Sequence, residues 1–192
     1  MSVAIIDYGA GNIQSIRFAL ARFGVSATLS SDPETIQSAS HVIFPGVGEA
    51  SSAMAKLKST QLDTYIPELT QPVLGICLGM QLMCNSSEEG NTTGLGIFDT
   101  EVVRFTATCN VPHMGWNKVK GSGVLFKKIP NESHFYLAHS YYAKPNGNTV
   151  GHCLYEINFA AAMAKNNFYG TQFHPEKSGS IGAQLLQNFL SL

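Results

Sequence analysis

The 192-residue sequence predicts an α/β fold with a central, mixed but mostly parallel sheet, and two features of the chain lead to this prediction. In the first half, short apolar runs alternate with helix-like stretches, and each run ends in a turn that contains Gly or Pro. In the second half, strand-like runs follow one another, which favours antiparallel additions to the same sheet.

The first half contains the apolar runs that predict parallel strands. They cover residues 3–6, 25–29, 42–44 and 73–76. Residues 13–23 have apolar side chains at helical spacing, and Gly24 then ends the predicted helix. This order of strand, helix and strand is typical of crossovers between parallel strands.

The second half contains five further strand-like runs and a last helix. The runs cover residues 101–105, 135–138, 150–154, 160–165 and 168–173. Residues 181–192 have their large apolar side chains on one helical face, so we expect this helix to pack against the sheet. The chain contains no repeat, linker or low-complexity tract, and residues 1–192 are therefore expected to form a single domain.

Composition and charge exclude several classes of function. Apolar residues make up 44% of the sequence and charged residues 13%, which fits a globular protein rather than a disordered one. The formal net charge of −1, with scattered Lys and Arg, gives no basic patch for nucleic acid. The first apolar run is too short to span a membrane and follows no basic segment, so we expect a soluble cytoplasmic protein.

The segment of residues 72–81 carries the most informative motif, because an apolar strand runs into Gly-x-Cys-x-Gly and then into a helix. This pattern is typical of a nucleophile elbow in which the Cys77 sulfur replaces a serine hydroxyl. Gly75 and Gly79 relieve crowding where the strand reverses into the helix. Backbone N–H groups at the helix N-terminus stabilise a thiolate and a developing oxyanion, with the Leu78 N–H as first donor.

The cysteines as a group have a simpler interpretation. Cys77, Cys84, Cys109 and Cys153 form no Cys-x-x-Cys pair, so neither a zinc ribbon nor a redox dithiol is expected, and disulfides are unexpected in the cytoplasm. Most cysteines are small buried side chains, and this is the alternative for Cys77 as well. Cys84 is interpreted as a packing residue two turns along the helix that follows Cys77.

A cysteine nucleophile needs a base, and residues 169–178 offer one at the end of an apolar strand. His174 and Glu176 flank Pro175, and in extended backbone such residues point to the same side with Cα atoms roughly 6.5 Å apart. The Glu176 carboxylate would then bind the imidazole Nδ1–H and hold Nε2 toward Cys77. The alternative is a surface turn that carries an unrelated His and Glu.

The remaining histidines lack such a partner. None of the histidines at positions 41, 113, 134 and 152 is followed two residues later by an acidic residue, and His139 belongs to a separate motif. No pair of histidines has metal-ligand spacing, so no metal is expected.

The turn of residues 45–48, Pro-Gly-Val-Gly, follows a predicted strand at the edge where open α/β sheets bind ligands. Its glycines let backbone N–H groups approach a ligand, and the Val47 N–H is expected to be the second oxyanion donor. A plain strand-to-helix turn is the alternative. Gly9 and Gly11 start a dinucleotide fingerprint, but Gln14 replaces its third glycine, and the chain lacks a P-loop. No nucleotide cofactor is therefore expected.

Together these motifs resemble those of the class I glutamine amidotransferases, which carry the cysteine elbow and a later His-Pro-Glu. The resemblance spans the whole chain. Residues 7–12, 45–48, 112–117, 139–141 and 172–178 are similar to segments of the glutaminase subunits of imidazole glycerol phosphate synthases. The elbow and the His-Pro-Glu occur in every branch of the superfamily, whereas residues 7–12 and 113–117 favour this one.

The resemblance implies a flavodoxin-like domain with helices on both faces of the sheet, and glutamine as the substrate. It also implies a heterodimer with a (β/α)8 cyclase of histidine biosynthesis. Ammonia would travel through the barrel to a ribosyl-phosphate intermediate, which would yield imidazole glycerol phosphate and an aminoimidazole carboxamide nucleotide.

Site residues follow from the elbow, the His-Pro-Glu and the resemblance. The catalytic triad would be Cys77, His174 and Glu176, with Val47 and Leu78 as oxyanion donors. Glutamine would contact Gly48, Gln81, Ser140 and Tyr141. The partner interface would include Asn12, Trp116, Tyr136 and Lys177.

Two alternatives remain open at this stage. The chain could be a glutaminase that serves a different synthase, or a hydrolase or binding protein that has retained the elbow without acting on glutamine. Loss of glutamine turnover on replacement of Cys77 would distinguish the glutaminase from the second alternative.

Overall fold

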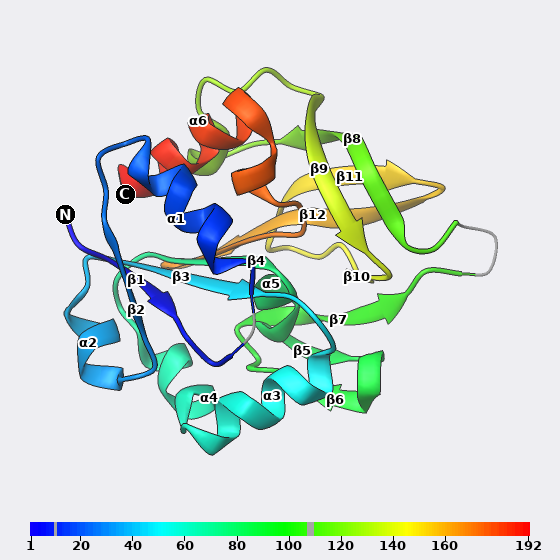
Figure 1. The fold of residues 1–192 in the computed structure, drawn as a ribbon. Coiled ribbons are helices and arrows are strands. Elements are labelled where there is room, and N and C mark those ends of the chain that lie inside the picture. The colour runs from blue at the N-terminus through cyan, green and yellow to red at the C-terminus, as the bar shows by residue number, and fades with distance from the viewer. Residues whose placement is uncertain (10, 107–109) are drawn as a thin grey trace.

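The computed structural model describes residues 1–9, 11–106 and 110–192. Cys109 and the centre of the Gly-Ala-Gly turn after the first strand lie outside these residues. In the described part of the chain, thirteen strands form one mixed sheet with helices on both of its faces (Figure 1). Within the same residues, no helix is long and apolar enough to cross a membrane.

The strands divide into a parallel half and a mainly antiparallel half. The strands are β1 (Val3–Ile6), β2 (Ala27–Ser30), β3 (His41–Gly46), β4 (Val73–Cys77), β5 (Cys84–Ser87), β6 (Thr92–Thr93), β7 (Phe98–Arg104), β8 (His113–Gly121), β9 (Ser133–His139), β10 (Tyr141–Ala143), β11 (Thr149–Tyr155), β12 (Ile157–Lys165) and β13 (Phe168–Thr171). The central order is β2-β1-β3-β4-β13-β12-β10-β7-β5-β6, and β11, β8 and β9 continue from β12.

Helices and helical turns connect these strands. They are α1 (Ile13–Ala21), α2 (Pro33–Ser38), α3 (Ala50–Ser59), α4 (Leu62–Tyr65), η1 (Ile66–Glu68), α5 (Leu78–Leu82), η2 (Glu89–Asn91), η3 (Val124–Phe126), η4 (Pro175–Lys177) and α6 (Gly179–Leu190). Figure 1 shows α1 and α6 over one face of the sheet and α2, α3 and α4 over the other.

Strand β1 shows why the centre of the sheet is apolar throughout. All four of its residues are buried, because alternate side chains enter opposite layers. Val3 and Ile5 pack with α1 and α6, whereas Ala4 and Ile6 pack with α2 and α3. A continuous apolar run of strand length is what a parallel strand covered on both faces requires.

The fold class predicted from sequence is confirmed, with several local corrections. Strand β13 lies parallel to β4, although it was expected to be an antiparallel addition, and it is antiparallel to β12. Helix α5 ends at Leu82, so Cys84 begins β5 instead of lying on that helix, although it is buried as expected. Strand β8 was not predicted, because its alternating exposed residues interrupt any apolar run.

Glycines allow the turn after β3 to contact the turn after β4. A Cβ on Gly46 would lie 2.6 Å from the Gly79 backbone N, and one on Gly75 would lie 2.8 Å from the Met80 backbone N. A Cβ on Gly79 would overlap the Phe44 carbonyl oxygen. Because these neighbours are backbone atoms, they cannot rotate away. The two turns therefore require glycine, which has a hydrogen in place of Cβ, at each of the three positions.

We predict that Gly79→Ala lowers the free energy of unfolding by about 3 kcal/mol, the upper range for overpacking in a dense core. Urea denaturation would measure this loss. The matched control is Gly147→Ala, since a Cβ there meets no atom within 4 Å, and its stability should be unchanged. Equal stability of the two variants would contradict the close contact.

Candidate active site

Cys77 lies at the sharp turn between β4 and α5. Its φ of 54° and ψ of −112° are unusual for a residue with a side chain, and the residue is 8% exposed. Backbone strain of this kind is found where a side chain must be held in one direction, and it costs about 1–3 kcal/mol. Gly46 and Cys77 are register partners, so the end of β3 lies beside the turn that carries Cys77.

His174 and Glu176 form the contact expected from the sequence, through a different backbone. The imidazole Nδ1 lies 2.9 Å from Glu176 Oε1, and the two side chains are 5% and 1% exposed. His174 is extended, but Pro175–Lys177 forms the helical turn η4, so the expected extended geometry is wrong for Glu176. The turn brings the carboxylate back to the imidazole and fixes Nδ1 as a donor.

Strand β9 holds the histidine loop in place. The His174 N–H donates to the Tyr136 carbonyl at 2.9 Å. Ser178 Oγ donates to the His174 carbonyl at 2.6 Å and accepts from the Tyr136 N–H at 3.0 Å. These three bonds connect the N–H and the carbonyl of His174 to Tyr136 of β9, directly or through Ser178. The backbone position from which the imidazole extends is therefore fixed.

The surroundings of His174 favour its charged form. Burial lowers the pKa of His174, but hydrogen bonds to Cys77 and Glu176, together with the charges of both groups, raise the pKa to about 10. The balance therefore favours an imidazolium beside the Cys77 sulfur. A cysteine that can pass its proton to such a base is a ready nucleophile.

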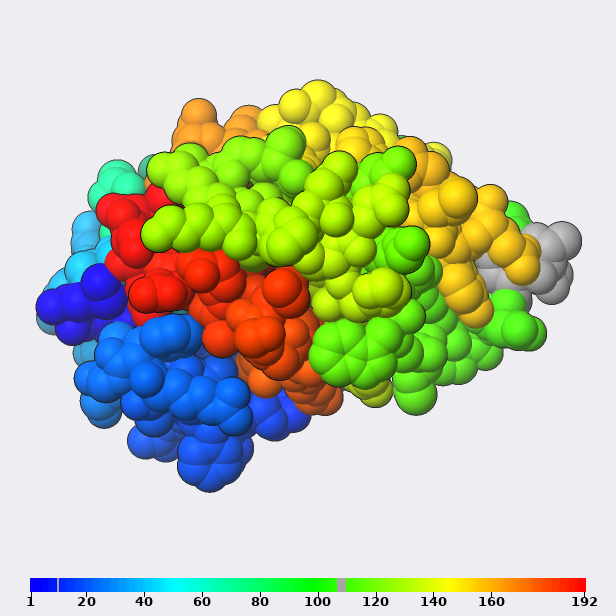
Figure 2. Space-filling model, turned by 90° about the horizontal axis from the view of Figure 1, so that it is seen from above, coloured from blue at the N-terminus to red at the C-terminus, as the bar shows by residue number. Residues whose placement is uncertain are grey.

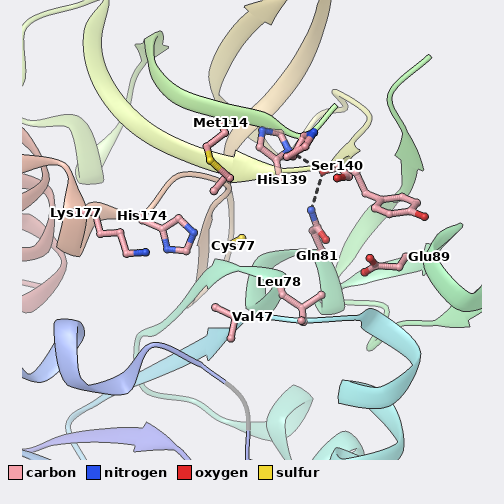
Figure 3. Close-up of a pocket in the computed structure, with 14 residues that line it drawn as sticks. Val47, Cys77, Leu78, Gln81, Glu89, Met114, His139, Ser140, His174 and Lys177 are labelled. Atoms are coloured by element: carbon pink, nitrogen blue, oxygen red, sulfur yellow. Dashed lines mark hydrogen bonds between the residues drawn. The ribbon is translucent and has the colours of Figure 1, made fainter. Parts of the chain in front are cut away.

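A pocket of about 300 Å³ opens over Cys77 (Figure 3). Its lining includes every residue that was expected to bind glutamine or to form the oxyanion hole. These residues are Val47, Gly48, Leu78, Gln81, Ser140 and Tyr141. In Figure 3, His174 lies on one side of Cys77 and Gln81 on the other, with Glu89 beyond Gln81.

The loop expected to supply the second oxyanion donor lies at the mouth of this pocket. Val47 is 43% exposed and Gly48 has a φ of +97°, a conformation that favours glycine. The buried Tyr8 hydroxyl donates to the Pro45 carbonyl at 2.8 Å. Burial and the charge of Cys77 raise the pKa of Tyr8, which keeps its hydroxyl a donor and secures the start of the loop.

Gln172 is a site residue that the sequence prediction missed. Its Nε2 donates to Cys77 Sγ at 3.7 Å, and its Oε1 accepts from Gln81 Nε2 at 2.8 Å. Gln172 is fully buried, so these polar contacts hold its amide in one orientation. Its position two residues before His174, on the same strand end, is the signal that could have identified it.

Glu89 is a second missed residue, at the other end of the pocket. Its Oε2 accepts from the Ala50 N–H at 2.9 Å. Burial raises the pKa of Glu89, the Ala50 hydrogen bond opposes this, and the neighbouring charge of Glu49 adds to the rise. The pocket lining thus has the Cys77 sulfur at one end and the Glu89 carboxyl group at the other.

Three of the four residues expected at a partner interface lie together. Lys177 Nζ lies 5.7 Å from the centroid of the Tyr136 ring, and the Trp116 and Tyr136 rings are 6.2 Å apart. Trp116 is 56% exposed, and Lys177 also lines the pocket. Asn12 lies before α1 and accepts a hydrogen bond from Ser15 at 3.0 Å. Figure 2 shows η4 in orange-red, close to β8 in green and α1 in blue on one face.

A family model described as glutamine amidotransferase class-I matches residues 4–192. The imidazole glycerol phosphate synthase subunit HisH of Bacteroides fragilis is 52% identical over 100% of both chains. The chain belongs to the class-I glutamine amidotransferases and to their HisH branch. The HisH subunits of Haemophilus influenzae and Escherichia coli are 48% and 45% identical, over 99% and 100% of this chain and 97% and 100% of their own.

Solved structures with lower sequence identity share the amidotransferase fold. A putative GMP synthase subunit from Thermoplasma acidophilum is 20% identical, with a TM-score of 0.77 over 100% of this chain and 92% of its own. A glutamine amidotransferase from Thermotoga maritima is 18% identical, with a TM-score of 0.64 over 100% and 83%. The mixed sheet of this chain is therefore that of the family.

We predict that the raised pKa of His174 makes stability depend on pH. The His174 imidazole binds its proton more tightly in the folded chain than in the unfolded chain, where its pKa is near the ordinary 6.5. The contribution of His174 to the free energy of unfolding is therefore complete below about pH 6.5, and it is lost as the pH rises toward about 10. Urea denaturation between pH 6 and pH 10 should show this fall, and His174→Asn should reduce it. An unchanged slope in the variant would contradict the assignment.

Proposed function

We propose that this protein is the glutaminase subunit of an imidazole glycerol phosphate synthase, and that Cys77, His174 and Glu176 are its catalytic triad. The observation that carries the catalytic assignment is the buried His174–Glu176 pair beside the Cys77 sulfur at the floor of the pocket. The full-length HisH relatives support the choice of synthase. We also propose that residues 1–192 act as one domain in the cytoplasm.

The chemistry of the pocket fits glutamine. Its carboxamide would lie over Cys77, and its α-ammonium group would lie at the other end, near the Glu89 carboxylate and the Gln81 amide. Gly48, Ser140 and Tyr141 contribute to the same lining, where backbone and hydroxyl groups suit the α-carboxylate. The polar groups therefore match the two ends of an amino-acid amide.

In the reaction, His174 holds the proton that it has taken from Cys77, which leaves a thiolate. The thiolate attacks the carboxamide carbon, and the Leu78 and Val47 N–H groups stabilise the oxyanion. His174 returns the proton to the nitrogen as the C–N bond breaks, which releases ammonia and leaves a thioester. Water attacks the thioester with His174 as general base, and glutamate leaves as Cys77 is regenerated.

A cyclase partner follows from the chemistry of the product. In bulk water at neutral pH, ammonia becomes ammonium, which has no lone pair with which to attack an acceptor. We propose a heterodimer with a (β/α)8 cyclase that covers the pocket mouth and receives ammonia through its barrel. Exposed Trp116, together with Tyr136, Lys177 and Asn12, would contact this partner.

We predict that Cys77→Ala lowers glutamine hydrolysis by roughly a thousandfold or more, because no nucleophile remains. Glutamate release by the complex would measure this. Synthesis from added ammonia should continue at the normal rate, since the cyclase does not need the thiol. Cys84→Ala is the matched control, because Cys84 is also buried but does not line the pocket. Persistent glutamine turnover in Cys77→Ala would show that the site is wrong.

We predict that the isolated chain hydrolyses glutamine slowly, and that the cyclase with its nucleotide ligand raises the rate about a hundredfold, the effect of one oxyanion-hole donor. The physical reason is reorientation of the Val47 peptide when the partner contacts the loop. Glutamate release with and without cyclase and ligand tests this. Equal rates in all mixtures would refute the coupling.

A further inference from the structure

Two buried histidines outside the triad lie next to the pocket and have no part in the reaction described above. His113 on β8 and His139 on β9 are register partners, and their relative exposures are 3% and 6%. His113 Nδ1 lies 3.0 Å from His139 Nε2. His139 also lines the pocket, whereas His113 stacks on Tyr155 with ring centroids 3.9 Å apart.

The hydrogen bonds of the pair permit one arrangement of protons. His139 Nδ1 lies 2.7 Å from the Tyr141 carbonyl, which only accepts, so Nδ1 carries the proton. In neutral His139, Nε2 is then an acceptor, and His113 Nδ1–H donates a hydrogen bond to it. His113 Nε2 is in turn an acceptor, and Asn117 Nδ2 lies 3.4 Å from it as donor.

Both imidazoles are neutral at physiological pH. Burial lowers the pKa of His113 to about 4. Burial also lowers the pKa of His139 to about 3; the Tyr141 hydrogen bond opposes this shift, and the charges of His113 and His174 add to it. Each ring of the pair therefore has one N–H donor, which is its Nδ1–H group.

The Tyr141 carbonyl joins this pair to the substrate pocket. Gln81 Nε2 donates to the same oxygen at 2.9 Å, and Figure 3 shows the two bonds as dashed lines from His139 and Gln81. Gln81 Nε2 also donates to Gln172 Oε1 at 2.8 Å. Both protons of the Gln81 amide are thus committed to protein acceptors, and its Oε1 is the atom left to meet the substrate.

We propose that His113 and His139 are positioning residues for glutamine, because their fixed tautomers hold the Tyr141 carbonyl so that Gln81 presents its amide oxygen to the α-ammonium group. This inference rests on the proposed glutaminase function. If His139 turned or changed tautomer, the carbonyl would lose one of its donors and the Gln81 amide could rotate. An amide NH2 group facing the ammonium group would repel it, whereas the amide oxygen accepts a hydrogen bond from it.

The tautomers are directly observable by ¹⁵N NMR of the full chain with ring-labelled histidine. For both His113 and His139, Nδ1 should carry the proton and Nε2 should not, at neutral pH. Signals are assigned by their loss in His113→Asn and His139→Asn. An Nε2-protonated tautomer or an imidazolium at either position would overturn the proposal, and this result does not depend on glutaminase activity.

Kinetics of the complex with the cyclase test the consequence for glutamine. His139→Phe keeps an aromatic ring but removes the donor, so KM for glutamine should rise about tenfold, while kcat changes less than about threefold. His139→Asn keeps a donor near the Nδ1 position and should restore most of the affinity. His113→Phe should show a smaller rise in KM. This change removes the donor that fixes the tautomer of His139, but the His139 imidazole itself remains.

His41→Phe is the matched control. His41 is also buried and packs on an aromatic ring, Phe189, but it lies at the far end of β3 from the pocket. This variant should leave KM unchanged. An unchanged KM in His139→Phe, or equal KM values for His139→Phe and His139→Asn, would overturn the proposal. Absence of glutaminase activity in the unmodified complex would refute the proposed function, and the NMR result would still decide the proton arrangement.

Discussion

The site depends on backbone contact between the turns that follow β3 and β4. Gly46 and Gly79 approach so closely that neither position can hold a Cβ, and this contact fixes the loop of residues 45–48 against the start of α5. Cys77, between these elements, adopts a positive φ because the strand must reverse there. One steric constraint therefore places the proposed nucleophile and both proposed oxyanion donors within one small region.

A second set of bonds organises the other side of the pocket from the antiparallel half of the sheet. Strand β9 holds the His174 loop through Tyr136 and Ser178, and it ends at His139, one of the two proposed positioning histidines. Strand β9 thus contacts both the His174 loop of the proposed triad and the proposed glutamine subsite. In the proposed function, a partner that contacts β8 and β9 at Trp116 and Tyr136 would act on both parts of the site together.

The sequence allowed the parallel strands of the first half to be predicted and the triad to be proposed, because both depend on local patterns. Continuous apolar runs indicate strands buried on both faces. Gly-x-Cys-x-Gly and His-Pro-Glu are short motifs in which each residue has a physical role within the motif itself. The contacts of Gln172 and of the His113–His139 pair could not be predicted this way, because their partners are 26 to 95 residues away along the chain. Strand β8 was missed since its exposed faces break the apolar pattern, and the η4 turn was missed because Pro175 also suits extended backbone.

The central claim is that Cys77 is the one thiol activated to attack a glutamine carboxamide. Mass spectrometry after incubation of the cyclase complex with 6-diazo-5-oxo-L-norleucine, an electrophilic glutamine analogue, tests it most directly. We expect a single adduct on the peptide that contains Cys77, lost when His174 is replaced by Asn and suppressed by excess glutamine. Labelling of Cys84, Cys109 or Cys153 in its place, or no labelling at all, would show that Cys77 is not the nucleophile.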